Sequence, residues 1–301
     1  AATATVFELG KKIEGTLGSA DDLDCFEFQA AKTGLATLKF EHAAVSGADA
    51  AVTYFTVKVY DAATQAEISN FTSAGANTSD SASFIVIANA KYVVAVEKGM
   101  VYDGTVGYGI TVTVDDKIAA ESEPNNTLDK ANKFELSTSG NAKYYYGAIS
   151  GAEDKDYYKI TVPSNGVINL YLYNEFAPKG NFTATLLAFE EDAAGVQTAR
   201  KVTSISVTNK EDSKIGPSVC VAKGDYILEI DGDAGSYKTR AFFRAVSNTE
   251  TENNDSLVQA DEIAVGTAYK ATLDEKSDKD IFKFTAAANN VGYDIVFTAT
   301  N

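Results

Sequence analysis

The chain has 301 residues, of which 26 are Lys or Arg and 42 are Asp or Glu, so its formal net charge is −16. This acidity argues against nucleic acid and anionic membranes as partners, because both need a basic surface, and it leaves cations, neutral polymers and basic partners open. A single histidine, His42, disfavours a His-based metal centre or an Asp–His–nucleophile triad. No apolar run approaches the roughly 18 residues of a membrane-spanning helix, so we expect no membrane insertion.

Short alternating segments predict β-strands along the whole chain. In chain order they include FEFQA at 26–30, YFTVKVYDA at 54–62, YKITV at 158–162, INLYLYN at 168–174 and YILEI at 226–230. Apolar and polar residues alternate in each, which is the period of a half-buried strand, and turn signals such as KTG, SNG and KGD separate them. The sequence therefore predicts an all-β protein of antiparallel β-sandwich or barrel domains.

Internal repeats divide the chain. ESEPNNTLDKANKFEL at 121–136 aligns with ETENNDSLVQADEIAV at 250–265. FIVIANAKYVVAVEKG at 84–99 aligns with VCVAKGDYILEIDGD at 219–233, and a final strand-like run follows each. We predict a first repeat over 1–118, a second over 119–248 with an N-terminal acidic linker, and a partial third over 249–301.

A block with the pattern Asp-x-Asp-x-aromatic occurs in all three repeats, as Asp22/Asp24/Phe26, Asp154/Asp156/Tyr158 and Asp278/Asp280/Phe282. Strand alternation predicts that Phe26 and Phe28 are buried, and likewise Tyr158 with Ile160 and Phe282 with Phe284. Cys25 faces the other way and is predicted, like Cys220, to be an unpaired thiol.

Taken together, the E-x-E-x-N-N/D-T/S linker, the D-x-D-x-aromatic strand, VYDAATQ at 59–65 and KGDYILEI at 223–230 resemble the bacterial pre-peptidase C-terminal domain family. That family includes the collagen-binding domains of clostridial collagenases. The resemblance covers the first two repeats and the first half of the third. It implies jelly-roll-like, non-catalytic β-sandwiches of secreted or cell-surface bacterial proteins, and calcium bound by the linker and the Asp pair.

The linker residues also suggest a calcium site on chemical grounds. Calcium prefers six to eight oxygen ligands, and an extended segment projects alternate side chains to one side. The predicted ligands are Glu121, Glu123, Asn125, Asn126, Asp154 and Asp156 in the second repeat, and Glu250, Glu252, Asn254, Asp255, Asp278 and Asp280 in the third. The alternative is a solvated acidic linker. Asn126 replaces the Asp of the collagen-binding pattern, so we expect the second site to be weaker than the third. The first repeat lacks the linker, so we expect it to lack the full site.

No catalytic motif is present, so we predict a protein that is not an enzyme. The expected partner is an extracellular polysaccharide or a collagen-like protein polymer, bound by a tandem, adhesive array. Candidate aromatic contacts are Tyr144, Tyr145, Tyr146, Tyr171 and Tyr173, and the alternative is that these rings pack a sandwich edge. Two alternatives stay open, namely a structural spacer or surface-layer component, and an accessory region of a larger secreted hydrolase.

The third repeat is predicted to be an incomplete domain. It holds the linker, the Asp-x-Asp strand and a strand-like run, VGYDIVFTAT at 291–300, but no counterpart of the later strands. Half a sandwich leaves edges and an apolar face uncovered. We expect the missing strands to come from further chain, from pairing onto the second repeat, or from strand exchange in a dimer through residues 249–301.

Overall fold

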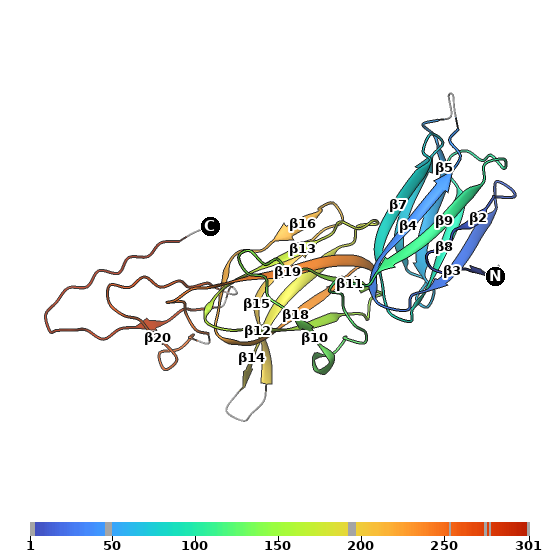
Figure 1. The fold of residues 1–301 in the computed structure, drawn as a ribbon. Helices are drawn as coiled ribbons and strands as arrows, with labels where there is room; N and C mark the ends of the chain where they lie inside the picture. Colours follow the sequence, from blue (N-terminus) through green and yellow to red (C-terminus); the bar gives the residue numbers. More distant parts are fainter. Residues whose placement is uncertain are drawn as a thin grey trace.

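The computed structural model describes residues 4–45, 50–191, 197–252, 254–273, 276 and 278–299 (Figure 1). The predicted all-β class is confirmed, since regular structure in these residues is almost entirely strand and the one helix is a single 3-10 turn, η1 (Leu128–Lys130). Within the same residues no helix has the length and apolarity needed to cross a membrane.

The first sandwich pairs a five-stranded sheet, in the order β1-β3-β8-β5-β6, with a four-stranded sheet, in the order β2-β9-β4-β7. Its strands are β1 (Thr5–Val6), β2 (Ile13–Gly15), β3 (Leu23–Gln29), β4 (Gly34–His42), β5 (Thr53–Asp61), β6 (Glu67–Ala74), β7 (Ser79–Val86), β8 (Lys91–Lys98) and β9 (Tyr108–Asp115).

The second sandwich repeats this plan, with one sheet in the order β10-β12-β18-β14-β15 and another in the order β11-β19-β13-β16, to which β17 adds by pairing with β13. Its strands are β10 (Asn132–Phe134), β11 (Tyr145–Ile149), β12 (Asp156–Val162), β13 (Gly166–Tyr173), β14 (Phe182–Glu191), β15 (Gln197–Val207), β16 (Ser213–Ile215), β17 (Val219–Val221), β18 (Gly224–Gly232) and β19 (Gly235–Ala245).

A short parallel strand pair opens each of the three repeats in the same register. β1 runs parallel to β3, β10 to β12, and β20 (Asp261–Glu262) to β21 (Phe282–Lys283), whereas the other ladders between strands are antiparallel. The aligned partners are Thr5 with Phe26, Asn132 with Tyr158, and Asp261 with Phe282. The aromatic residue of the Asp-x-Asp-x-aromatic block therefore holds the same place in all three repeats.

The alternation within this block fills both cores as predicted. Phe26 and Phe28 belong to the core of the first sandwich, and Tyr158 and Ile160 to that of the second. The prediction is wrong for the third repeat, where Phe284 is 41% exposed. In the described part of the third repeat no second sheet faces this ring, which lies against Tyr293 with ring centroids 5.2 Å apart.

The run at 291–300 was predicted to be a strand, and this is wrong for its described part, 291–299, which forms no ladder. In Figure 1 this segment passes along the outside of the C-terminal end without a neighbouring strand. Phe297 is 88% exposed, and Ile295 and Val296 are similarly open to solvent. Strand-forming sequence alone does not make a strand, because the backbone needs partners for its hydrogen bonds.

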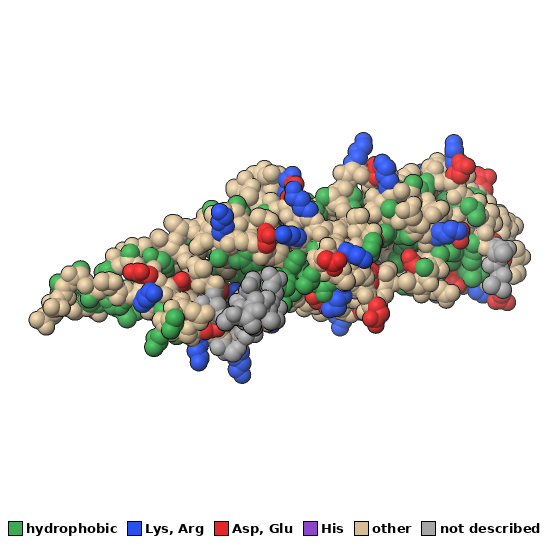
Figure 2. Space-filling model, turned by 90° about the horizontal axis from the view of Figure 1, so that it is seen from below, with side chains coloured by type: hydrophobic (Ala, Val, Ile, Leu, Met, Phe, Trp, Pro, Cys, Tyr) green, Lys and Arg blue, Asp and Glu red, His purple; other side chains and the backbone are tan. Residues whose placement is uncertain are grey.

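The repeats are joined end to end by direct hydrogen bonds, which gives the elongated shape seen in Figures 1 and 2. The Ile85 amide donates to Ser236 Oγ at 2.8 Å, and both residues are buried at this junction. The Cys220 amide donates to Thr272 Oγ1 at 3.0 Å, which links β17 to the third repeat. Cys25 and Cys220 form no disulfide with each other, as predicted.

Candidate metal centre

The acidic linker adds to the second sandwich as an extra edge segment beside β11. The Glu121 amide donates to the Tyr146 carbonyl at 3.0 Å, and the Tyr146 amide donates to the Ala119 carbonyl at 3.0 Å. The Glu121 side chain turns inward, where its Oε1 accepts from the Ala148 amide at 2.6 Å. The extended linker therefore delivers its first carboxylate to the end of the sandwich.

Three predicted ligands meet at this end. Glu121, Glu123 and Asp156 each offer a carboxylate oxygen, and these oxygens all lie within 4.8 Å of one another. Oxygens that coordinate one calcium ion at 2.3–2.6 Å would lie at most about 5 Å apart. Glu121 and Asp156 are buried and Glu123 is half-buried. No ion pair between described residues involves these three carboxylates.

Several oxygens in this cluster have no hydrogen-bond donor. They are Glu123 Oε1, Asn125 Oδ1 and Asp156 Oδ1, each buried. Buried polar atoms nearly always have partners, and an ionised carboxylate without one is costly. An all-oxygen set of acidic and amide ligands fits a hard cation such as calcium, which accepts variable geometry, rather than zinc, which favours nitrogen and sulfur. The residues present therefore fit the ion that the linker motif implies.

Asp156 is oriented by a pair of buried tyrosines. Tyr237 donates to Asp156 Oδ2 at 2.5 Å, and Tyr158 lies 2.7 Å from the Tyr237 hydroxyl. Because the Tyr237 hydroxyl donates its hydrogen bond to the carboxylate, Tyr158 is the donor in the hydrogen bond between the two hydroxyls. Gly147 makes room for this pair, since a Cβ there would lie 2.3 Å from Tyr237 Oη and 2.9 Å from Glu121 Oε2.

The crowded carboxylates hold protons strongly when no cation is bound. Burial, followed by the charge of Asp156, raises the pKa of Glu121 well above its ordinary value. Burial also raises the pKa of Asp156 to about 7, even though hydrogen bonds from Glu121 and Tyr237 act in the opposite direction. At neutral pH protons and a cation therefore compete for these carboxylates.

Two other predicted ligands of this repeat are engaged elsewhere. Asp154 Oδ2 accepts from the Ser150 amide at 2.6 Å and from Ser150 Oγ at 2.7 Å, which closes the turn before β12. Asp154 Oδ1 accepts from Asn126 Nδ2 at 3.0 Å. Asp154 and Asn126 therefore brace the loop beside the cluster, and the structure does not bring them into the group of three.

The third repeat rebuilds the same arrangement from its own residues. Glu250, Glu252 and Asp280 offer oxygens within 4.8 Å of one another, and Glu250 Oε1 accepts from the Thr272 amide at 2.5 Å, as Glu121 does from Ala148. Buried oxygens without a donor recur at Glu250 Oε2, Asn254 Oδ1 and Asp280 Oδ1. Burial and the charge of Asp280 raise the pKa of Glu250 to about 9.

The two remaining predicted ligands of the third repeat, Asp255 and Asp278, also lie outside its group of three carboxylates. Asp255 Oδ1 accepts from the Lys279 amide at 3.1 Å. Asp278 also makes an interaction, and it does not belong to the group of three. The recurrence of the whole arrangement in two repeats argues against an accidental gathering of acidic residues.

The first sandwich keeps the aspartates and the tyrosine of the site. Asp22 Oδ2 accepts from the Gly18 amide at 2.7 Å, as Asp154 does from Ser150, and Tyr108 donates to Asp24 as Tyr237 does to Asp156. The residues described before β1 supply no counterpart of Glu121 or Glu123.

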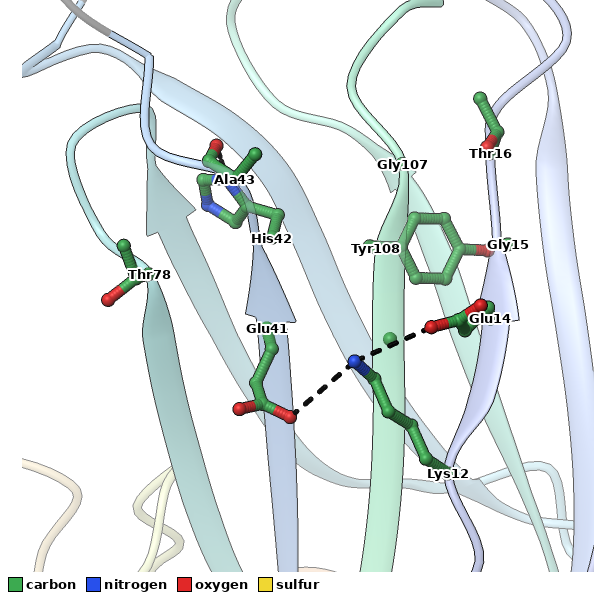
Figure 3. A pocket seen from close by; sticks show the side chains of 11 residues that line it. Lys12, Glu14, Gly15, Thr16, Glu41, His42, Ala43, Thr78, Gly107 and Tyr108 are labelled. Carbon is green, nitrogen blue, oxygen red and sulfur yellow. Dashed lines mark hydrogen bonds and ion pairs between the residues drawn. The ribbon is translucent and has the colours of Figure 1, made fainter.

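The first sandwich also carries a polar pocket of about 590 Å³, lined in part by residues of β2, β4 and β9 (Figure 3). Lys12 bridges two of its carboxylates, at 3.6 Å from Glu14 and 3.9 Å from Glu41. His42 Nε2 lies 2.9 Å from Ser73 Oγ, and Ser73 in turn donates to Asp80. Ser73 is fully buried and stands between the histidine and the aspartate, so it cannot serve as a nucleophile for a substrate.

Four of the five predicted tyrosines gather on the outer face of the sheet formed by β11, β19 and β13. Tyr144 is 36% exposed, and Tyr146, Tyr171 and Tyr173 are partly exposed beside it. Tyr145 points inward instead and stacks on Phe134 in the core, with ring centroids 4.1 Å apart. Alternation along β11 explains the difference, because neighbouring residues of a strand face opposite ways.

Sequence reasoning missed some residues of both sites. Tyr237 was not singled out, although it stands directly before the final strand-like run at 238–246, and Tyr108 begins the corresponding run at 108–114 of the first repeat. The outward cations Lys238 and Arg240, which lie among the tyrosines, were also missed. The alternation of basic residues along the run 238–246 was the signal that could have found them.

Comparison with known proteins gives structural likeness only. No model of a known protein family matches the chain, and no curated protein matches its sequence. Among solved structures, the chain is similar to a pre-peptidase C-terminal domain of a Bacillus anthracis collagenase. The alignment has 19% sequence identity, covers 38% of this chain and 97% of that chain, and has a TM-score of 0.29.

Two tandem structures align over more of the chain. The CBM22-1 and CBM22-2 tandem of Paenibacillus barcinonensis Xyn10C has 11% identity, 82% coverage of this chain, 100% of that chain and a TM-score of 0.24. The tandem CBM51 modules of a Streptococcus pneumoniae family 98 glycoside hydrolase have 10% identity, 78% coverage of this chain, 84% of that chain and a TM-score of 0.26. The family suggested by the linker motif is thus represented among the structures similar to this chain.

Proposed function

We propose that this chain is a non-catalytic array of calcium-stabilised β-sandwich modules that docks on an extracellular polymer. The observation that carries the proposal is the recurrence of one cluster in two repeats, each with three convergent carboxylates and buried oxygens that lack donors. A cation would supply the positive charge that these oxygens otherwise lack. The resemblance of the linker motif supports a secreted or cell-surface bacterial setting for such an array.

The expected polymer surface is the outer face that carries Tyr144, Tyr146, Tyr171 and Tyr173. The rings stand in pairs, with Tyr171 and Tyr173 stacked at 6.5 Å and Tyr144 and Tyr173 in edge contact at 5.9 Å. Rigid aromatic side chains on the outer face of a sheet suit an extended polysaccharide or a protein polymer, because they offer contact area at low entropic cost.

A structural spacer is the second candidate, and the junctions between repeats favour it. The buried bond from the Ile85 amide to Ser236 Oγ, together with the bond from the Asn70 amide to the Ala177 carbonyl at 3.3 Å, ties the first sandwich to the second. Such contacts suit a chain that sets a distance. A spacer needs the calcium sites but not the aromatic face.

Two measurements separate these functions. Thermal melting of metal-stripped protein with and without calcium tests the clusters, since a ligand at a hundredfold excess over its Kd adds about 2.7 kcal/mol to the stability of the folded state. Retention on a panel of polysaccharides and collagen tests docking. A calcium response without retention of any polymer leaves the spacer, and no calcium response contradicts the proposal.

A further inference from the structure

The outer face of β19 concentrates positive charge in an acidic protein. Its outward positions carry Lys238, Arg240 and Arg244, while the whole chain has a net charge of −16. The strand lies between β11 and β13, with Lys238 opposite both Tyr146 and Tyr173, and Arg240 opposite Tyr171. Two rows result, each with a cation between tyrosines.

Arg240 is held by rings rather than by a carboxylate. Its guanidinium carbon lies 3.9 Å from the centroid of the Tyr171 ring and 5.4 Å from that of Tyr144. It forms no ion pair with any residue that the structure describes, and its Nε is buried without an acceptor. Cation–π contacts offset part of the cost of this partial burial, but they satisfy none of the five N–H donors.

Lys238, in the neighbouring row, has a carboxylate partner for its charge. It lies 4.6 Å from the centroid of the Tyr173 ring and 5.9 Å from that of Tyr146, and it donates to Glu175. Of the two cations held between tyrosines, Arg240 is therefore the one whose hydrogen-bonding capacity is left over. The Arg240 residue as a whole is half-buried and not closed off from solvent.

We propose that this Tyr144–Arg240–Tyr171 row receives an acidic group, carboxylate or sulfate, of an anionic polysaccharide. The planar fork of a guanidinium matches both oxyanions in a bidentate way, and partial desolvation by the rings strengthens the pair. The ring edges and hydroxyls beside it suit the carbon faces and hydroxyls of sugars. The second row lies two residues along the strands, roughly 7 Å away, and meets the adjoining sugar. This inference rests on the proposed docking function and names its ligand class.

Dextran derivatives give a matched test with the full chain. Retention is measured by affinity electrophoresis in calcium against neutral dextran, carboxymethyl-dextran, dextran sulfate and poly-glutamate. We expect retention by one or both anionic dextrans, with the better of the two identifying the acidic group, and little by neutral dextran or poly-glutamate. Arg240→Gln should weaken the retention at least tenfold, whereas Arg244→Gln, an exposed arginine on the same strand, should change it less than twofold. Equal melting temperatures of the two variants exclude a folding defect.

The possible contrary results overturn different claims. Equal losses in the two variants, or equal retention by poly-glutamate, would show that only net charge is sensed and would overturn the inference. Retention by neutral dextran that Arg240→Gln leaves unchanged overturns the inference and keeps polymer docking. Absence of retention by every probe overturns both, while the calcium response of the melting curve still tests the metal clusters separately.

Discussion

Replacing Asp156 by Asn should have opposite effects on the second sandwich with and without calcium. In chelator the folded state holds Asp156 at a pKa of about 7, above the ordinary value of about 3.9. Folding therefore favours the protonated carboxyl. The associated stability is fully present below about pH 4 and is lost as the pH rises through about 7. At pH 8 the ionised carboxylate works against the fold.

The size of the effect follows from the pKa. One pH unit corresponds to about 1.4 kcal/mol, so a rise of roughly three units is worth at most about 4 kcal/mol. Because Asp156 shares its protons with Glu121, we expect Asp156→Asn to gain about 2–4 kcal/mol in chelator at pH 8, or roughly 5–10 °C in melting temperature. In calcium the variant should gain nothing further, while the parent gains about 2.7 kcal/mol at a hundredfold excess over Kd.

The assay is thermal unfolding at pH 8 in chelator and in calcium, in a Glu250→Gln background so that one site alone responds. Asp24→Asn is the matched control, since Tyr108 binds Asp24 as Tyr237 binds Asp156, but no described residue stands in the place of Glu121 or Glu123. The control should leave the calcium response intact. A variant that melts below its parent in chelator, or that still responds fully to calcium, would refute the reasoning.

Three further predictions follow from the same structure. The metal-stripped chain should lose stability between about pH 5 and pH 9, because the pKa of Asp156 is raised to about 7 and that of Glu250 to about 9; calcium should flatten this melting profile, and a chelated chain that gains stability over this range contradicts the assignment. Gly147→Ala should cost about 1–3 kcal/mol in denaturant unfolding, because the new Cβ meets Tyr237 and Glu121, while Gly151→Ala, with no atom within 4 Å, should be nearly neutral; equal costs would count against the close packing. The intact chain should scatter light as a dimer that loses its contacts when residues 287–301 are removed, because Ile295 to Phe297 are exposed strand-forming residues; an intact monomer argues against strand exchange.

The sequence allowed the strands and the carboxylate set to be predicted, because both depend on local spacing. Alternation placed Phe28 and Ile160 in the cores, and the linker spacing brought Glu121 and Glu123 to one side. It failed at Phe284 and at 291–299, where burial and pairing require strands that lie far away in sequence. The roles of Tyr237 and Arg240 could not be predicted for the same reason, since they depend on which strands become neighbours.

Calcium titration of the metal-stripped chain by calorimetry is the most direct test of the central claim. Two equivalent clusters predict binding at two sites per chain. Glu121→Gln should remove one of them, Glu250→Gln the other, and the double variant both. A chain that binds no calcium, or a double variant that binds as the parent does, would contradict the account.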